Sequence, residues 1–282
     1  MTTPPLDVEL TKAVLAYLGV TAAAPPLDLL DALVTAYTRT VPWESASRIA
    51  RRAQTAAIAD CPRWPDVFWQ QAIRHGTGGT CFESNYAFFS LLRALGYDGY
   101  LTINNMGDTL ACHTAIVVLL DGQRWLTDVG MPIYLPLPFG PEDVPSRRTA
   151  FQTYTVRPDG AGIYQVERAP HPSPNCFTLF DRPIPDATYR AALTADYEPT
   201  GFFNDRVILT KVIGEEIWRF NGVTPPRMES FVYGGRADRA LEGAAADVVA
   251  DRFGIDAEMA RTALRATGVE ASPPSPLTIA DK

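Results

Sequence analysis

The sequence predicts an α+β fold, and three observations indicate it. Apolar residues recur at helical spacing over the first ninety-odd residues, short strand-like runs follow from about residue 97, and helical spacing returns near residue 245. Helices and strands that are segregated along a chain, and do not alternate, are typical of α+β proteins. With 282 residues, of which 46% are hydrophobic, the chain is long enough to bury a large core.

The N-terminal part is expected to begin with two helices. Residues 8–18 place apolar side chains at helical spacing and Gly19 ends the pattern, while residues 25–41 begin with two prolines and end before Pro42. Residues 45–62, which include a stretch rich in arginine and alanine, give no clear assignment.

A glycine-rich turn, Gly76-Thr77-Gly78-Gly79-Thr80, leads into the next expected helix. Residues 82–95 contain neither glycine nor proline and are rich in apolar side chains, and Gly96 follows as a C-terminal stop. We therefore expect a buried helix whose first turn contains Cys81.

The middle and C-terminal parts are expected to form hairpins and then two helices. Turn residues such as Asp121-Gly122 separate runs that favour strands. The expected strands are residues 100–103, 113–120, 124–129, 154–156, 164–166, 206–212 and 216–220, followed by helices at 245–252 and 256–267 and a tail over the last dozen residues.

Composition and cysteine usage narrow the class of protein. The formal net charge is −7, so electrostatics give no reason to expect nucleic acid as a partner. The N-terminus lacks the basic and apolar regions of a secretory signal, and no stretch has the ~18 apolar residues of a membrane span, which indicates a cytoplasmic protein. No metal site is expected, because no C-x-x-C pair occurs among the four cysteines, which are expected to be thiols: Cys61, Cys81, Cys112 and Cys176.

Cys81 is the candidate nucleophile. Cysteine chemistry needs a thiolate, and a helix N-terminus or a neighbouring imidazolium lowers a thiol pKa from its usual value of about 8.5. Cys81 has the helix N-terminus available, after Gly78 and Gly79, whose backbone freedom suits a sharp turn. The alternative is that the two glycines mark a tight turn only and that Cys81 is a core residue.

His113 is the candidate base among three histidines. It opens an apolar strand, where a polar side chain needs a partner. His75 lies in the approach to the glycine turn, and His171 lies in a proline-rich loop where a solvated role is expected.

A two-residue turn at Asp121-Gly122 supplies that partner. Such a turn places Ala115 opposite Asp128, so His113 and Asp128 share a face as diagonal neighbours about 7–8 Å apart. The alternative is that Asp128 merely ends the strand. A cysteine, a histidine and an aspartate in this order can form a triad in which the acid orients the base. Such a triad fits a protease, a transglutaminase-like enzyme or an acyltransferase.

The residues around this triad resemble the arylamine N-acetyltransferase family. The resemblance covers nearly the whole chain and is most specific over the central fifty residues. The segment from Gly78 to Asn85 is similar to the family's Gly-Gly-x-Cys-x-Glu-x-Asn motif. The other matching segments are Val41-Pro42-Trp43-Glu44, His113-Thr114, Leu126-Thr127-Asp128-Val129-Gly130 and, less closely, Pro199-Thr200-Gly201-Phe202-Phe203 and Phe253-Gly254-Ile255.

The resemblance implies a fold and a division of the chain. It implies a cysteine-proteinase-like arrangement of three parts: a helical bundle with the nucleophile over residues 1–95, an antiparallel β-barrel with the histidine and aspartate over 96–200, and an α/β lid over 201–282. The triad is then expected between the first two parts.

The resemblance also implies ping-pong chemistry. Cys81 attacks an acyl thioester, typically acetyl-CoA as cosubstrate, and a small-molecule amine then attacks the acyl-cysteine while His113 takes its proton. Asp128 keeps His113 oriented. Trp43 and Phe203 are expected to line the acceptor pocket, with a core tryptophan as the alternative for Trp43.

Departures from the family pattern leave the donor and acceptor open. Thr77 stands where the family usually has arginine, Ser45 where it has asparagine, and Met131-Pro132 where it has Phe-Gly. One alternative is an amide synthase of natural-product biosynthesis, which would take its acyl group from a thioester on an acyl carrier protein. Further alternatives are a cysteine hydrolase and a binding module without activity.

Overall fold

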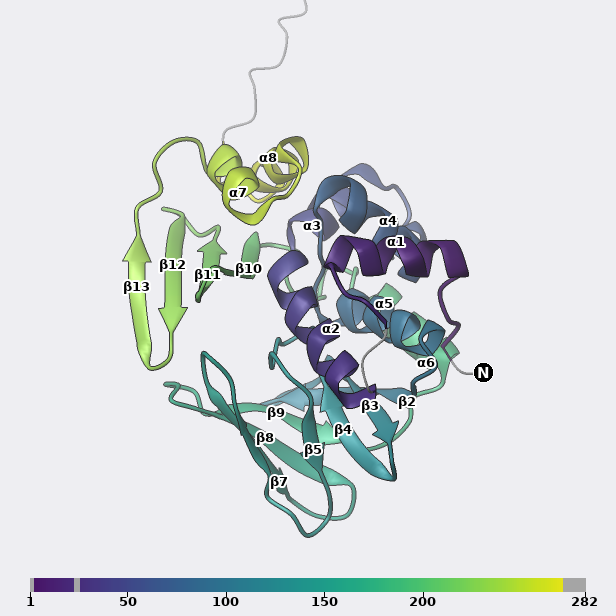
Figure 1. Cartoon of the computed structure of the whole chain (residues 1–282). Coiled ribbons are helices and arrows are strands. Elements are labelled where there is room, and N and C mark those ends of the chain that lie inside the picture. Colours follow the sequence, from purple (N-terminus) through teal and green to yellow (C-terminus); the bar gives the residue numbers. More distant parts are fainter. Residues whose placement is uncertain (1–2, 23–25, 271–282) are drawn as a thin grey trace, which may run out of the picture.

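The computed structural model describes residues 3–22 and 26–270, and it confirms the α+β class. Helices from the N-terminal half gather on one side of an antiparallel sheet, and a second sheet with two helices lies beside them (Figure 1). The helices are α1 (Val8–Leu18), α2 (Pro26–Thr40), α3 (Ala46–Gln54), α4 (Pro65–His75), α5 (Cys81–Ala94), α6 (Asp186–Ala195), α7 (Ala245–Phe253) and α8 (Ala257–Ala266), with a 3₁₀ turn η1 (Ile58–Asp60).

The larger sheet has eight strands in the order β5-β4-β3-β2-β9-β8-β7-β6, and all its pairings are antiparallel. Strand β5 also packs against β7, so the sheet curls into a barrel-like shape. The strands are β2 (Asp98–Met106), β3 (Thr109–Leu120), β4 (Gln123–Thr127), β5 (Leu137–Phe139), β6 (Ser146–Arg148), β7 (Thr153–Pro158), β8 (Ile163–Ala169) and β9 (Asn175–Phe180).

The smaller sheet has five strands in the order β1-β10-β11-β12-β13, which are β1 (Trp43–Glu44), β10 (Ile208–Ile213), β11 (Glu216–Asn221), β12 (Arg227–Val232) and β13 (Gly235–Arg239). Helices α7 and α8 share its hydrophobic core with α3. Strand β1 and helix α3 come from the N-terminal part of the chain but join this sheet and its core. The division of the chain into three consecutive parts therefore remains our proposal.

Helix α5 lies at the centre of the helical part. Every residue from Cys81 to Leu92 is buried, including the polar side chains of Glu83, Ser84, Asn85 and Ser90. Glycine ends α1 as predicted: Gly19 has a φ of 67°, and its N–H bonds to carbonyls of the last turn. The predicted hairpin is also confirmed, since Asp121 and Gly122 both have positive φ and Leu120 pairs with Gln123.

Several elements escape sequence analysis for physical reasons. Helix α3 buries polar side chains, including Arg48 at 1% exposure, so its buried face shows no apolar pattern. Strand β3 starts at Thr109, four residues before the predicted start. Its first residues, Thr109 to Ala111, are exposed, so they do not show the alternation of apolar and polar side chains by which a half-buried strand is predicted. The last twelve residues, expected to be a tail, lie outside the described residues.

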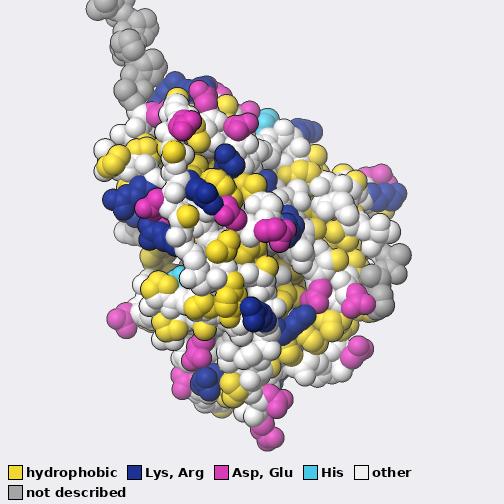
Figure 2. All heavy atoms as spheres, turned by 60° about the vertical axis from the view of Figure 1, so that its left-hand side comes forward, with side chains coloured by type: hydrophobic (Ala, Val, Ile, Leu, Met, Phe, Trp, Pro, Cys, Tyr) yellow, Lys and Arg dark blue, Asp and Glu magenta, His cyan; other side chains and the backbone are white. Residues whose placement is uncertain are grey.

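Acidic and basic side chains are interspersed over the face in Figure 2, with hydrophobic side chains between them. Within the described ranges, we find no helix that is both long and apolar enough to span a membrane.

Candidate active site

The turn before Cys81 is held in close contact with strand β1. A Cβ on Gly78 would lie 1.6 Å from the Pro42 carbonyl oxygen, so only glycine fits there. The Gly78 N–H donates to the Glu44 carboxylate at 3.1 Å, and the Glu44 N–H donates to the Gly79 carbonyl at 3.2 Å. The chain then enters α5 with Cys81 as its first residue, as predicted.

His113 and Asp128 form a buried pair. Nε2 of His113 lies 2.6 Å from Oδ2 of Asp128, and the two residues are 1% and 0% exposed. The β3–β4 ladder stops at Ile116 and Thr127, so Asp128 lies just beyond the strand, and its predicted pairing with Ala115 is not part of the ladder. The predicted proximity of the imidazole and the carboxylate is nevertheless confirmed.

The second oxygen of Asp128 is fixed by three donors. Oδ1 accepts from the Asn85 amide at 3.0 Å and from the backbone N–H groups of Gly130 and Met131 at 2.7 and 2.9 Å. These bonds stabilise the carboxylate in one orientation. On its other side the His113 ring contacts Phe177, with ring centroids 4.5 Å apart.

Hydrogen bonds join the start of α5 to the strand that carries His113. The Thr114 hydroxyl donates to the Cys81 carbonyl at 3.1 Å, and the Asn85 amide donates to the Thr114 carbonyl at 2.6 Å. The Cys81 Sγ lies 3.7 Å from the Cys112 carbonyl oxygen. The structure therefore places Cys81 beside Cys112 and Thr114, the two chain neighbours of His113.

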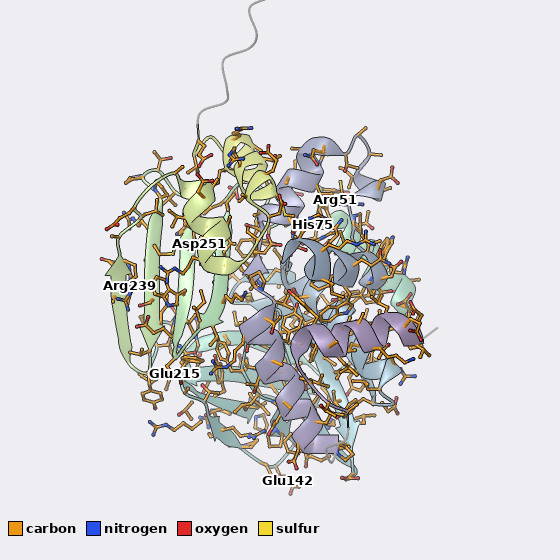
Figure 3. All side chains as sticks on the ribbon, turned by 45° about the horizontal axis from the view of Figure 1, so that its top comes forward. Arg51, His75, Glu142, Glu215, Arg239 and Asp251 are labelled. Carbon is orange, nitrogen blue, oxygen red and sulfur yellow. The ribbon has the colours of Figure 1, made fainter. Side chains whose placement is uncertain are left out.

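The other two histidines lie apart from this group. His75 ends α4 at the surface, where its Nδ1 is 3.9 Å from Asp256 (Figure 3). His171 is in the loop between β8 and β9 and bonds to the backbone of Ser173.

Burial raises the pKa of the Cys81 thiol, and the negative charges of Asp196 and Asp128 raise it further, while the Thr114 backbone and Arg48 oppose this. This direction is opposite to the one expected from the helix N-terminus alone. A thiolate at Cys81 therefore requires a proton acceptor next to it, because the surroundings favour the neutral thiol.

A buried ion pair lies next to the turn that leads into Cys81. Arg48 on α3 contacts Asp196 at 2.6 Å, and the same guanidinium donates to the Thr80 hydroxyl at 2.7 Å. Asn204 accepts from Arg48 at 3.1 Å. This network ties the residue before Cys81 to the loop after α6, which carries Phe203.

The two predicted pocket residues meet. Trp43 and Phe203 contact edge to face, with ring centroids 4.9 Å apart. Trp43 lies beside the turn from Gly76 to Thr80 that leads into Cys81, since it forms a parallel bridge with Gly79. The indole N–H of Trp43 is buried and has no hydrogen-bond partner among the residues that the structure describes. It is therefore a donor available to a bound molecule.

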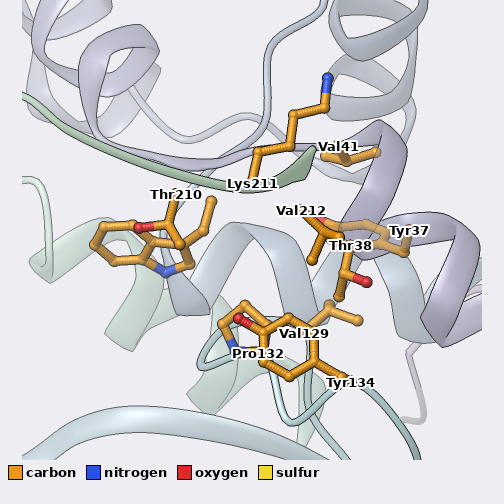
Figure 4. A pocket seen from close by; sticks show the side chains of 10 residues that line it. Tyr37, Thr38, Val41, Val129, Pro132, Tyr134, Thr210, Lys211 and Val212 are labelled. Atoms are coloured by element: carbon orange, nitrogen blue, oxygen red, sulfur yellow. The ribbon is translucent and has the colours of Figure 1, made fainter. Parts of the chain in front are cut away.

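Trp43 also lines a small cavity that reaches Val129, the residue after Asp128. Pro132 and Tyr134 lie beside Val129 in it, and strand β10 forms another wall (Figure 4). The ammonium group of Lys211 points out of this cavity and donates to the Phe253 carbonyl at 2.8 Å, so the cavity wall is mostly apolar.

Several of these residues have roles that were not predicted from the sequence. Asn85 is part of the matched motif, and its contact with the site could have been predicted, because it follows Cys81 by four positions and so lies on the same face of α5. Arg48 and Asp196 gave no local signal, since they are 148 residues apart in the chain.

Gly130 offers a test of how tightly the site is packed. A Cβ at Gly130 would lie 2.5 Å from the Cys81 Cα and 2.6 Å from the Asn85 amide nitrogen. We expect Gly130→Ala to displace Cys81, lower the activity of the site about 100-fold and destabilise the fold by about 1–3 kcal/mol. Steady-state kinetics and urea unfolding measure the two effects.

The matched control is Gly140→Ala, where the nearest atom to an added Cβ is the Asp143 carboxylate at an ordinary 3.7 Å. Full activity in the Gly130→Ala variant would contradict the close packing of Gly130 on Cys81.

The chain is similar in sequence to known proteins. A family model described as N-acetyltransferase matches residues 26–260. A curated relative, Proansamycin X synthase of Amycolatopsis mediterranei, is 30% identical over 112 residues, which is 38% of this chain and 42% of that protein. The match thus spans less than half the length of this relative.

Solved structures with the same fold include arylamine N-acetyltransferases. That of Mycobacterium abscessus has a TM-score of 0.74 at 23% identity, covering 93% of this chain and 95% of that one. That of Mycobacterium marinum in complex with CoA has a TM-score of 0.77 at 21% identity, covering 92% and 99%. A Bacillus cereus enzyme, described as having a Cys-His-Glu catalytic triad, has a TM-score of 0.73 at 16% identity, covering 89% and 100%.

Proposed function

The chain belongs to the N-acetyltransferase family, and from this premise we propose that it transfers an acetyl group from acetyl-CoA to an aryl amine through an acyl-cysteine at Cys81. The observation that carries the proposal is the His113–Asp128 pair, held beside the first residue of α5. The CoA bound to the Mycobacterium marinum relative supports a CoA thioester as donor.

The first half-reaction forms the acyl-enzyme. Nε2 of His113 is engaged by Asp128, so Nδ1 is the nitrogen left to accept the Cys81 proton. The thiolate attacks the thioester carbonyl, and the Cys81–acyl bond forms as the acyl–sulfur bond to CoA breaks. The proton on His113 passes to the leaving CoA thiolate. The N–H groups in the first turn of α5 lack partners within the helix and are available to the oxyanion.

The second half-reaction discharges the acyl group. The amine attacks the acyl-cysteine carbonyl, and its proton passes to His113 and then to the released Cys81 sulfur. Trp43 and Phe203 offer two aromatic surfaces beside the nucleophile turn, which suits an aromatic amine. The Trp43 N–H is available to donate a hydrogen bond to an acceptor atom of that ligand.

The test is the intact mass of the protein after mixing with acetyl-CoA and no amine. We expect one acetyl adduct on the wild type and none on Cys81→Ala, and loss of the adduct when an aryl amine such as aniline is added. An unmodified wild type whose Cys81 still reacts with an alkylating reagent would contradict acetyl-CoA as donor. Rapid loss of the adduct without amine would instead indicate a hydrolase.

A second candidate is amide synthesis from a carrier-bound acyl thioester. The observation that favours it is the departure from the family pattern at Thr77 and at Met131-Pro132. Family membership and the CoA complex of a relative favour the acetyl-CoA donor. Acylation by an acyl carrier protein thioester, but not by free CoA thioesters, would reverse this preference.

A further inference from the structure

We propose that Arg63 is a positioning residue for the nucleophile and takes the place of the arginine that the family has immediately before its Gly-Gly pair, where this chain has Thr77. The inference rests on the proposed function in one respect, namely that Cys81 is the reacting group.

Arg63 lies between η1 and α4, and its side chain is fully buried. Its Nη2 donates to the Gly78 carbonyl at 2.7 Å, and its Nη1 lies 3.4 Å from the Thr77 hydroxyl. The guanidinium therefore contacts both Thr77 and Gly78 in the turn before Cys81.

The same guanidinium binds Glu83 in the first turn of α5. Both Nε and Nη2 donate to the Glu83 carboxylate, and the Arg63 backbone N–H donates to it at 3.0 Å. The Tyr197 hydroxyl supplies a further donor at 2.5 Å. Burial favours the neutral form of Glu83, but Arg63 outweighs this and lowers its pKa, so the pair is charged. Arg63 thus clamps the turn before Cys81 to the helical turn that begins with Cys81.

The limited space around the Arg63–Glu83 pair explains why small residues lie next to it. A Cβ on Gly79 would lie 3.1 Å from the Glu83 carboxylate and 3.2 Å from Nη2 of Arg63. Thr77 is 1% exposed and already in contact with the guanidinium. A guanidinium reaching this point from residue 77 would compete with Arg63 for the same volume, so one of the two positions supplies the cation.

The experiment uses Arg63→Met, Thr77→Arg and the double variant, with Arg124→Met as control. Arg124 is a matched control because it also pairs with a buried carboxylate, that of Asp181. It lies on strand β4, whereas Arg63 lies before α4. The readouts are the rate of Cys81 alkylation by iodoacetamide across pH, and kcat and KM for acetyl-CoA. We expect Arg63→Met to lower alkylation at neutral pH about tenfold and kcat about 100-fold, with KM for acetyl-CoA within about twofold of the wild type.

We expect the double variant to regain at least about tenfold in kcat over Arg63→Met, while Thr77→Arg alone is impaired because two guanidinium groups meet. A double variant no better than Arg63→Met, or an Arg63→Met variant that alkylates like the wild type, would overturn the inference. If Arg63→Met does not fold, recovery of folding and alkylation in the double variant supports the inference, and no recovery overturns it.

Alkylation needs no acyl donor, so it separates the two proposals. A wild type that gains no acetyl group but shows this dependence on Arg63 would count against acetyl-CoA and leave the role of Arg63 standing.

Discussion

Cys81→Ser is expected to abolish acyl transfer, lowering kcat/KM at least about 10⁴-fold. A serine hydroxyl is far less acidic than a thiol, and burial of Cys81 already disfavours the anion. His113 can accept a proton from a thiol in this setting much more readily than from a hydroxyl. The measurement is CoA release in the presence of an aryl amine, together with the acetyl adduct by intact mass.

Cys112→Ser is the matched control, because Cys112 is half-buried in the strand next to His113 and its carbonyl contacts the Cys81 thiol. We expect this control to keep the acetyl adduct. Activity retained in Cys81→Ser, or lost equally in Cys112→Ser, would remove Cys81 from the role of nucleophile.

The elements that could be predicted from the sequence are those set by local chemistry. The Asp121-Gly122 dipeptide determines a two-residue turn, and that turn fixes the β3–β4 register as far as Ile116 and Thr127, one residue before Asp128. Glycines 78 and 79 and the run after them indicated where α5 begins. The fold class followed from the order of such segments, while the barrel and lid came from a family resemblance.

The residues that could not be predicted act across long stretches of chain. Arg48 reaches Asp196 from 148 positions away, and Arg63 reaches Glu83 from 20 positions away. A charged side chain of this kind looks like a solvated residue until its buried partner is known. The same pairs hide α3 and the segment before α4 from hydrophobic patterns, because their buried faces are polar.

These buried pairs explain how a nucleophile can be both buried and fixed. Arg48 holds Thr80 immediately before Cys81, and Arg63 holds Gly78 and Glu83 on either side of it. We do not propose that either arginine takes part in the reaction itself. Together they restrict the turn so that Cys81 lies beside the strand of His113, as the proposed proton transfer from Cys81 to His113 requires.

His113→Ala is therefore expected to change the pH dependence of Cys81 more than its position. Without an acceptor the thiol keeps the raised pKa that burial gives it. Because the thiolate fraction increases with pH, alkylation by iodoacetamide should be about 100-fold slower at neutral pH and should recover only above the ordinary thiol pKa of about 8.5. The wild type should react at neutral pH, since His113 takes the proton there.

Two controls separate this effect from misfolding. His75→Ala removes a surface imidazole and should leave the alkylation profile unchanged. Added imidazole should partly restore neutral-pH alkylation in His113→Ala, because the base is then supplied from solution to the space left by the side chain. A His113→Ala profile identical to that of the wild type would mean that Cys81 is ionised by its helix and neighbours alone, and that the pair with Asp128 has only a structural role.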